Sequence, residues 1–206
     1  YMIYSLYYMA KRYEVREIYN GSLTDHLLFY RGIKTEKDRQ DFLNPSYDNH
    51  THDPFLLKDC EKAVDRILKA INDNEKIVIY SDYDTDGIPA GVCMHDTFKK
   101  IGYTNFLNYI PHRHDEGFGL NVGAIKDFKE QDVGLIITLD CGIADIEPVS
   151  FAKKNGIDVI ITDHHIPGKI IPDAYAIVNP KQDNCNYPEK MLCGSGVGYK
   201  LIQGIL

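Results

Sequence analysis

The 206-residue sequence lacks features that mark several classes of protein. It has no run of about 18 apolar residues, so we expect no membrane-spanning helix and no membrane partner. Its five cysteines form no CxxC pair and show no zinc-ligand spacing, and their odd number argues against a disulfide framework. Free thiols in a reducing, cytoplasmic location are therefore expected. The apolar first residues lack the basic region and the cleavage site of a signal peptide.

The charge balance narrows the choice of partners. The net charge of −7 has the wrong sign for a protein that holds nucleic acid through charge alone. A nucleic-acid substrate stays open, because clustered carboxylates become locally neutral or positive once they hold divalent cations. With 44% hydrophobic residues, the length suits one domain with a sizeable core and a small N-terminal appendage.

Apolar runs alternate with helical patterns in most of the chain. Strands are expected over residues 77–80, 105–110, 135–139, 158–161 and 175–178, and helices over residues 24–31, 35–43, 57–71, 88–100, 122–129 and 145–155. This alternation predicts an α/β fold, with a parallel sheet covered by helices on both faces and a small helical N-terminal extension. We assign residues 1–52 to the extension and a polar linker, and residues 53–206 to the main domain. The structure of residues 1–20 is left open.

Acidic and imidazole side chains follow three of the predicted strands. They are Asp82, Asp84 and Asp86 after the first strand, Asp140 after the third, and Asp163, His164 and His165 after the fourth. Because ligands of open α/β sheets bind beyond the carboxyl ends of the strands, we expect these side chains to converge. Hard oxygen ligands with an imidazole favour Mn²⁺ or Mg²⁺ over zinc.

The motifs around these residues resemble a known family. DYDTDG, TLDCGI and TDHH are similar to the DHH phosphoesterase superfamily, and FLNP, DPFLL, PHR with EGFGL, VNP and GSGVG follow in the order of the RecJ exonucleases. The resemblance runs from about Leu27 to the end of the chain. It implies that Asp84, Asp86, Asp140 and His164 are metal ligands, with Asp140 bridging two ions of Mn²⁺ or Mg²⁺.

Other roles rest partly on geometry. Asp82 matches a position near the first metal, although a strand-end carboxylate bonded to backbone amides is an alternative. Neighbouring residues of a regular strand point to opposite sides, so both histidines should not bind one metal. The resemblance implies His164 as the ligand and His165 as a contact to the substrate phosphate. Asp163 is expected to orient an imidazole by accepting its other N–H. Asp140 and His165 are thus the candidate catalytic residues.

Two further segments are candidates for substrate binding. Arg113 follows the second strand at the same sheet edge and could grip a phosphate, although a solvated surface arginine is an alternative. Gly194, Ser195 and Gly196 open the last helix, where backbone amides could cradle a phosphate or allow close helix packing.

The resemblance implies metal-dependent phosphodiester hydrolysis, as a 5′ to 3′ exonuclease on single-stranded DNA in repair and recombination. Other repair or replication proteins are expected as further partners. A phosphodiesterase for short oligonucleotides or cyclic dinucleotides, a pyrophosphatase or polyphosphatase, and a non-catalytic scaffold are the alternatives. FLNP and DPFLL favour the exonuclease, and the retained acids argue against the scaffold.

The chain departs from the family pattern in two places. Tyr80 stands where many DHH members carry a metal-binding histidine. The family's fourth metal-binding aspartate and its C-terminal domains lie beyond Leu206, so we expect this chain to be the N-terminal catalytic part of a longer protein. Preference for DNA over RNA, polarity and oligomeric state are not visible in these residues.

Overall fold

The described part of the first of two compact units is helical. The computed structural model describes residues 21–206, and the chain divides into Tyr1–Thr51 and His52–Leu206. The described part of the first unit holds helices α1 (Leu23–Tyr30), α2 (Glu36–Leu43) and α3 (Tyr47–His50). Thr35 caps α2 by accepting the N–H of Asp38, and α2 ends before Asn44-Pro45, as predicted. The polar linker segment contains the single turn α3. Residues 1–20 lie outside the described part.

The second unit is built on one parallel sheet. Its elements are η1 (Pro54–Leu56), α4 (Cys60–Asn72), β1 (Lys76–Ser81), α5 (Gly87–Lys100), β2 (Phe106–Tyr109), α6 (Val122–Glu130), β3 (Val133–Leu139), α7 (Ile146–Lys154), β4 (Asp158–Thr162), β5 (Ala176–Val178) and α8 (Gly194–Ile205). The strand order is β2-β1-β3-β4-β5, and every neighbouring pair is parallel. The α/β prediction is therefore confirmed.

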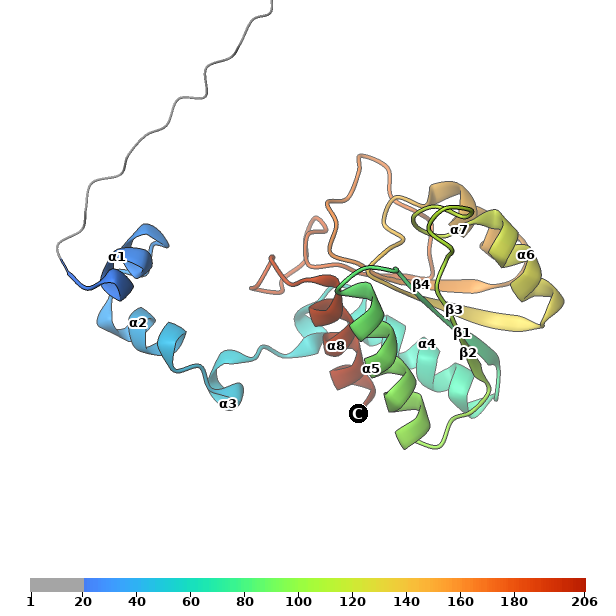
Figure 1. The fold of residues 1–206 in the computed structure, drawn as a ribbon. Coiled ribbons are helices and arrows are strands. Elements are labelled where there is room, and N and C mark those ends of the chain that lie inside the picture. Colours follow the sequence, from blue (N-terminus) through green and yellow to red (C-terminus); the bar gives the residue numbers. More distant parts are fainter. Residues whose placement is uncertain (1–20) are drawn as a thin grey trace, which may run out of the picture. The chain divides into compact units, whose positions relative to one another are not determined.

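Helices cover both faces of this sheet, with α4, α5 and α8 on one side and α6 and α7 on the other (Figure 1). Successive strand residues point to opposite faces. In β1, Ile77 and Ile79 pack with the first set of helices, and Val78 and Tyr80 pack with the second. The fully buried strands explain why the sequence shows continuous apolar runs rather than strict alternation.

Helix α4 differs from its prediction at its first turn and on one side. It begins at Cys60 rather than Leu57, because Pro54 starts the short 3₁₀ turn η1 and Leu57 is extended. Ile67 and Leu68 both belong to the helically spaced apolar residues of this segment, but Ile67 is fully buried and Leu68 is 43% exposed. The apolar stripe of α4 is therefore narrower than the sequence pattern indicates.

The backbone aligns the residues that follow β1, β3 and β4. The N–H groups of Asp82, Asp140 and Asp163 each donate to the last carbonyl of the neighbouring strand, at 3.1, 2.9 and 3.1 Å. The sheet order changes direction between β1 and β3, which is the switch point where open α/β sheets bind ligands. The register of the sheet thus brings these three aspartates to one edge.

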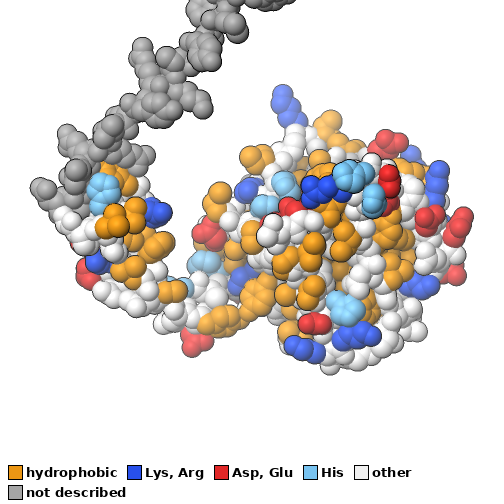
Figure 2. Space-filling model, viewed as in Figure 1, with side chains coloured by type: hydrophobic (Ala, Val, Ile, Leu, Met, Phe, Trp, Pro, Cys, Tyr) orange, Lys and Arg blue, Asp and Glu red, His pale blue; other side chains and the backbone are white. Residues whose placement is uncertain are grey.

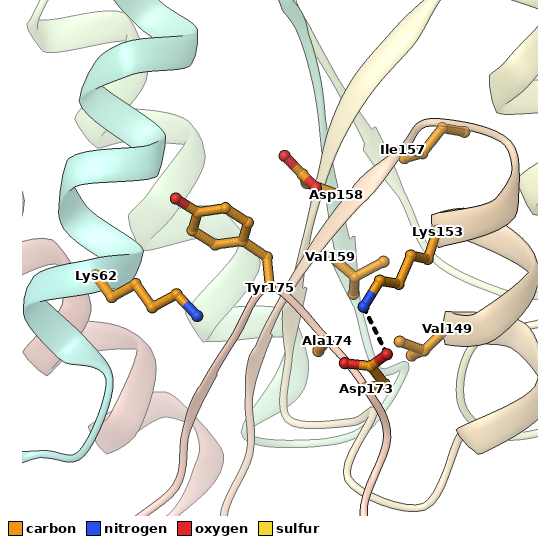
Figure 3. A pocket seen from close by; sticks show the side chains of 9 residues that line it. All are labelled: Lys62, Val149, Lys153, Ile157, Asp158, Val159, Asp173, Ala174 and Tyr175. Carbon is orange, nitrogen blue, oxygen red and sulfur yellow. Dashed lines mark hydrogen bonds and ion pairs between the residues drawn. The ribbon is translucent and has the colours of Figure 1, made fainter.

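A cavity of about 220 Å³ lies at the opposite edge, by the amino end of β4 (Figure 3). Its basic groups have partners within the protein. Lys153 Nζ is 2.5 Å from a carboxylate oxygen of Asp173, and Lys62 Nζ lies 4.9 Å from the ring centroid of Tyr175. We therefore look for the functional site at the carboxyl edge. Within residues 21–206 no helix is long and apolar enough to cross a membrane.

The buried centre of the sheet predicts a large difference between two aliphatic substitutions. Ile137→Ala in β3 removes a side chain with no exposed surface and should lower the free energy of unfolding by about 2–5 kcal/mol. Leu68→Ala, the matched control on α4, should cost about 1 kcal/mol or less. Urea denaturation of both variants measures this. Equal losses would contradict the packing described here.

Candidate metal centre

The loop after β1 turns its acids inward through bonds to its own backbone. Asp84 Oδ1 accepts the N–H groups of Asp86 and Gly87, at 3.2 and 3.0 Å. Asp82 Oδ1 accepts the N–H of Tyr83 at 2.7 Å, and its side chain is nearly fully buried. The turn ends at Asp86, which is the N-cap residue of α5. Asp82 thus combines the backbone bonding considered as its alternative role with a place in the acidic cluster.

Asp140 is the most unusual residue of the site. Its φ of +66° lies in the left-handed region, which costs a residue other than glycine about 1–3 kcal/mol. The backbone is held there by the bond from the Asp140 N–H to Thr162 and by the Thr138 hydroxyl, which donates to the carbonyl of Cys141. The side chain has no exposed surface, and neither carboxylate oxygen has a hydrogen-bond partner within the described part of the chain.

The predicted ligands converge on this carboxylate. His164 Nε2 lies 3.2 Å from Asp140 Oδ1 and 3.7 Å from Asp86 Oδ2. Two sets of side chains each offer three ligand atoms that lie within 4.8 Å of one another. They are Asp82, Asp84 and Asp140, and Asp140, His164 and His165. Because both sets contain Asp140, the arrangement can hold two cations that share one carboxylate.

The expectation that the two imidazoles point to opposite sides is wrong. Their ring centroids lie only 4.6 Å apart. The strand rule does not apply, because β4 ends at Thr162 and Asp163 turns the chain. Asp163 Oδ1 accepts the backbone N–H groups of His164 and His165 at 2.7 and 3.0 Å, and it contacts Nδ1 of His165 at 2.7 Å. Asp163 therefore orients His165.

Burial and crowding set the charges of the cluster. Burial, together with the negative charges of Asp86 and Asp84, raises the pKa of Asp140 to about 9. For Asp84, burial acts in the same direction, but the N–H of Gly87, the neighbouring Asp140 carboxyl and the N–H of Asp86 outweigh it and hold its pKa below the ordinary value. The two carboxyls interact, and Asp140 holds its proton to a higher pH than Asp84 does.

Helix α8 closes one side of the cluster. The N–H of Gly194 donates to Asp86 Oδ2 at 2.7 Å, and the Ser195 hydroxyl donates to the Asp86 carbonyl at 2.6 Å. A Cβ at Gly194 would lie 2.1 Å from Asp140 Oδ1, whereas one at Gly196 would meet its nearest neighbour, Leu192, at 3.3 Å. Close packing on the acids is therefore an observed role of Gly194, and phosphate binding by residues 194–196 stays a prediction.

Arg113 lies beside the cluster, on the loop between β2 and α6. Its guanidinium carbon is 4.2 Å from the ring centroid of Tyr83. Burial raises the pKa of Asp82, and the charge of Arg113 opposes this shift. Arg113 is exposed between two histidines of this loop. On the face of the molecule drawn in Figure 2, imidazole and basic side chains lie among hydrophobic ones. The guanidinium is thus placed on an aromatic ring near the acids.

The sequence motifs contain further site residues to which we assigned no role. Asn179 follows β5 as the aspartates follow their strands, and its fully buried side chain donates to the carbonyl of His165 at 2.9 Å. Applying the strand-end rule to β5 would have found it. The buried Tyr80 hydroxyl donates to the carbonyl of Gly119 at 2.7 Å, so this side chain is engaged by the loop before α6.

Comparison with known proteins agrees with this geometry. Residues 76–205 match the model described as the DHH family, N-terminal domain. The chain belongs to this DHH family. It is 45% identical over 185 residues to the single-stranded-DNA-specific exonuclease RecJ of Bacillus subtilis, which is 89% of this chain and 23% of that protein. It is 32% identical over 200 residues to RecJ of Haemophilus influenzae, covering 96% of this chain and 34% of that protein.

Two solved structures extend the comparison of this DHH chain. A crystal structure of exonuclease RecJ bound to manganese matches with a TM-score of 0.66 and 30% identity, over 72% of this chain and 37% of that one. RecJ from Thermus thermophilus in complex with Mn²⁺ matches with a TM-score of 0.67 and 25% identity, over 86% and 24%. The chain thus spans about a quarter to a third of the length of the two curated relatives.

The contact between α8 and Asp140 makes a prediction for two glycines of one motif. Gly194→Ala places a methyl group against a buried carboxylate and should destabilise the protein by about 1–3 kcal/mol, as overpacking does. Gly196→Ala should be tolerated, because it meets only the flexible end of Leu192 and alanine favours a helix. Thermal and urea unfolding of both variants measures this. A stable Gly194→Ala variant beside a destabilised Gly196→Ala variant would refute the packing.

Proposed function

We propose that this chain is the metal-binding part of an exonuclease that degrades single-stranded DNA from the 5′ end, using two ions of Mn²⁺ or Mg²⁺. The observation that carries the proposal is the Asp140 carboxylate, buried without a hydrogen-bond partner in the described part and shared by two sets of ligand atoms. The similarity to RecJ exonucleases, two of them solved with manganese, supports the same reading.

The donor set fits such ions. Carboxylate oxygens dominate, and imidazole nitrogen completes the set, a combination that suits Mn²⁺ better than the sulfur- and histidine-rich sites of zinc. Asp82 and Asp84 would hold one ion with Asp140, and Asp140, His164 and His165 face the other, with Asp86 beside His164. When bound, the pair of ions activates a water molecule and stabilises charge on the phosphoryl oxygens.

The chain's own side chains would position the phosphodiester. Arg113 would bind a phosphate oxygen through its guanidinium, which the ring of Tyr83 supports from one side. His165, held by Asp163, would contact the substrate phosphate or serve as a further ligand. Because the bound cations and the Arg113 guanidinium would supply positive charge locally, the net charge of −7 does not oppose a DNA substrate.

The proposed cellular location rests on the cysteines rather than on the metal centre. The five cysteines are free thiols, and three of them are buried. Free thiols persist in a reducing compartment, so we place the protein in the cytoplasm. Contacts with other repair or replication proteins stay a prediction.

Binding of Mn²⁺ should strengthen as the pH rises. The pKa of Asp140 is raised to about 9, so below that pH a cation must displace a proton from this carboxyl. The apparent Kd should therefore fall by up to about tenfold per pH unit between about pH 7 and about pH 8.5. Calorimetric titration in two buffers of different ionisation enthalpy should also show release of about one proton.

Asp140→Asn is the control for this titration. It keeps the shape of the side chain but has no proton to lose and no charge to share between ions. It should bind Mn²⁺ weakly and without the proton release assigned to Asp140. An affinity that does not change with pH in the unmodified protein would contradict the raised pKa.

Activity should separate the roles of Asp140 and Arg113 in the complete protein. Asp140→Asn should lower kcat about a thousandfold or more, since metal-based charge stabilisation supplies several kcal/mol. Arg113→Ala should mainly raise KM, by about 10- to 100-fold, because it loses a charge-assisted bond to phosphate. The assay uses 5′-labelled single-stranded DNA with Mn²⁺, and duplex DNA and a cyclic dinucleotide as alternative substrates.

Lys126→Ala on the exposed side of α6 removes the same charge as Arg113→Ala and should leave KM unchanged. Full activity of Asp140→Asn would refute the shared carboxylate. Cleavage of the cyclic dinucleotide but not of single-stranded DNA would replace the proposed substrate with a small phosphodiester.

A further inference from the structure

Phe118 is an exposed aromatic side chain beside the metal centre. It is 53% exposed, and its ring lies edge-on to that of His165, with centroids 5.8 Å apart and an interplanar angle of 81°. His165 in turn stands beside Asp140 and His164. None of the roles assigned above uses Phe118. Because about half of its side chain stays in water, Phe118 gains only part of the free energy that burial of a phenylalanine provides.

The segment that carries Phe118 is anchored on its N-terminal side by Glu116. The carboxylate of Glu116 accepts the Tyr109 hydroxyl, the backbone N–H of His112 at 2.7 Å and the side-chain amide of Asn121 at 3.0 Å. These bonds tie the segment to the end of β2 and to the start of α6. The approach to Phe118 is therefore fixed by bonds to two elements.

The C-terminal side of the segment is anchored as well. The carbonyl of Gly119 accepts the buried Tyr80 hydroxyl, and the N–H of Leu120 donates to Asp145 Oδ2 at 2.7 Å. Gly119 has a φ of +80°, and a Cβ there would lie 2.6 Å from the carboxylate of Asp145. The backbone thus holds Phe118 outward between two fixed points, which is the arrangement expected of a rigid contact surface.

We propose that Phe118 is a platform on which a nucleobase next to the scissile phosphate stacks. This proposal rests on the proposed function and adds a base subsite to the same centre. An aromatic ring binds the face of every base, so it grips single-stranded nucleic acid without reading its sequence. Bases of a duplex are already stacked and paired, so the platform favours single strands.

The geometry places this platform where the reaction needs it. Phe118 contacts His165, and His165 faces the shared carboxylate, so a base on the ring lies one side chain away from the groups that hold the phosphate. Arg113 lies on the same loop as Phe118, between β2 and α6, and its guanidinium packs on the ring of Tyr83. Arg113 supplies the phosphate contact. Base and phosphate are then held by one anchored segment.

The test compares intact strands with strands that lack a base. The complete protein with Mn²⁺ is assayed on single-stranded DNA carrying a tetrahydrofuran abasic residue at either nucleotide that flanks the scissile phosphate. The abasic strand should lower kcat/KM of the unmodified protein about tenfold, within the range of one base–aromatic stack. Phe118→Ala should lose a similar factor on the intact strand and little more on the abasic strand, with the change mainly in KM.

Two substitutions and one control sharpen the comparison. Phe118→Tyr should keep the discrimination between the two strands, and Phe118→Leu should lose most of it while keeping apolar bulk. Ile101→Ala removes another exposed apolar side chain, at the C-terminal end of α5 and so at the end away from Asp86. It should change kcat/KM for neither the intact nor the abasic strand. Thermal unfolding shows whether each variant is folded.

The outcomes separate the two proposals. Equal loss by Phe118→Ala on intact and abasic strands overturns the stacking platform, and it would mean that the ring serves another contact. Cleavage of neither strand by the unmodified protein overturns the proposed function. In that case, binding of both strands measured by fluorescence anisotropy still decides the platform, because only stacking couples Phe118 to the missing base.

Discussion

The Asp140 carboxylate is buried and lacks a hydrogen-bond partner within the described residues, and the rest of the site is arranged around it. Leaving such a group unsatisfied costs several kcal/mol. Burial and the neighbouring carboxylates raise the pKa of Asp140 to about 9, so a bound proton relieves part of this cost. Two cations that share this carboxylate, one on the side of Asp84 and one on the side of His164, would relieve it more fully. The strained backbone of Asp140 and the close approach of Gly194 are consistent with a residue whose position is fixed by that need.

The parallel sheet makes this arrangement possible without long-range adjustments. Asp82, Asp140 and Asp163 each continue the hydrogen-bond ladder by one residue beyond their strands, so the register of the sheet fixes their spacing. The connecting loops then add groups that the ladder cannot supply. Asp163 turns both imidazoles to one side, and the segment around Phe118 is tied to β2 and α6. The strand ends thus place the candidate metal ligands, and the anchored loop carries the proposed substrate contact.

The extent to which the sequence predicts the site follows from this division. Asp82 and Asp140 could be placed from sequence, because apolar strands and the strand-end rule determine where they lie. The shared side of His164 and His165 could not, because the end of β4 and the turn at Asp163 depend on hydrogen bonds that a strand pattern does not encode. Phe118 was also missed, since its position depends on bonds from distant residues. In the fold, the strands were predicted closely, whereas Leu68 shows that helical spacing alone overestimates a buried face.

The most direct test of the central claim is the anomalous X-ray diffraction of crystals of the protein soaked with Mn²⁺. The account predicts two manganese peaks that share Asp140 as a ligand, one completed by Asp82 and Asp84 and the other by the imidazole side. Calcium-soaked crystals serve as the control for peaks specific to manganese. A single peak that does not touch Asp140, or no peak beside this carboxylate, would contradict the account.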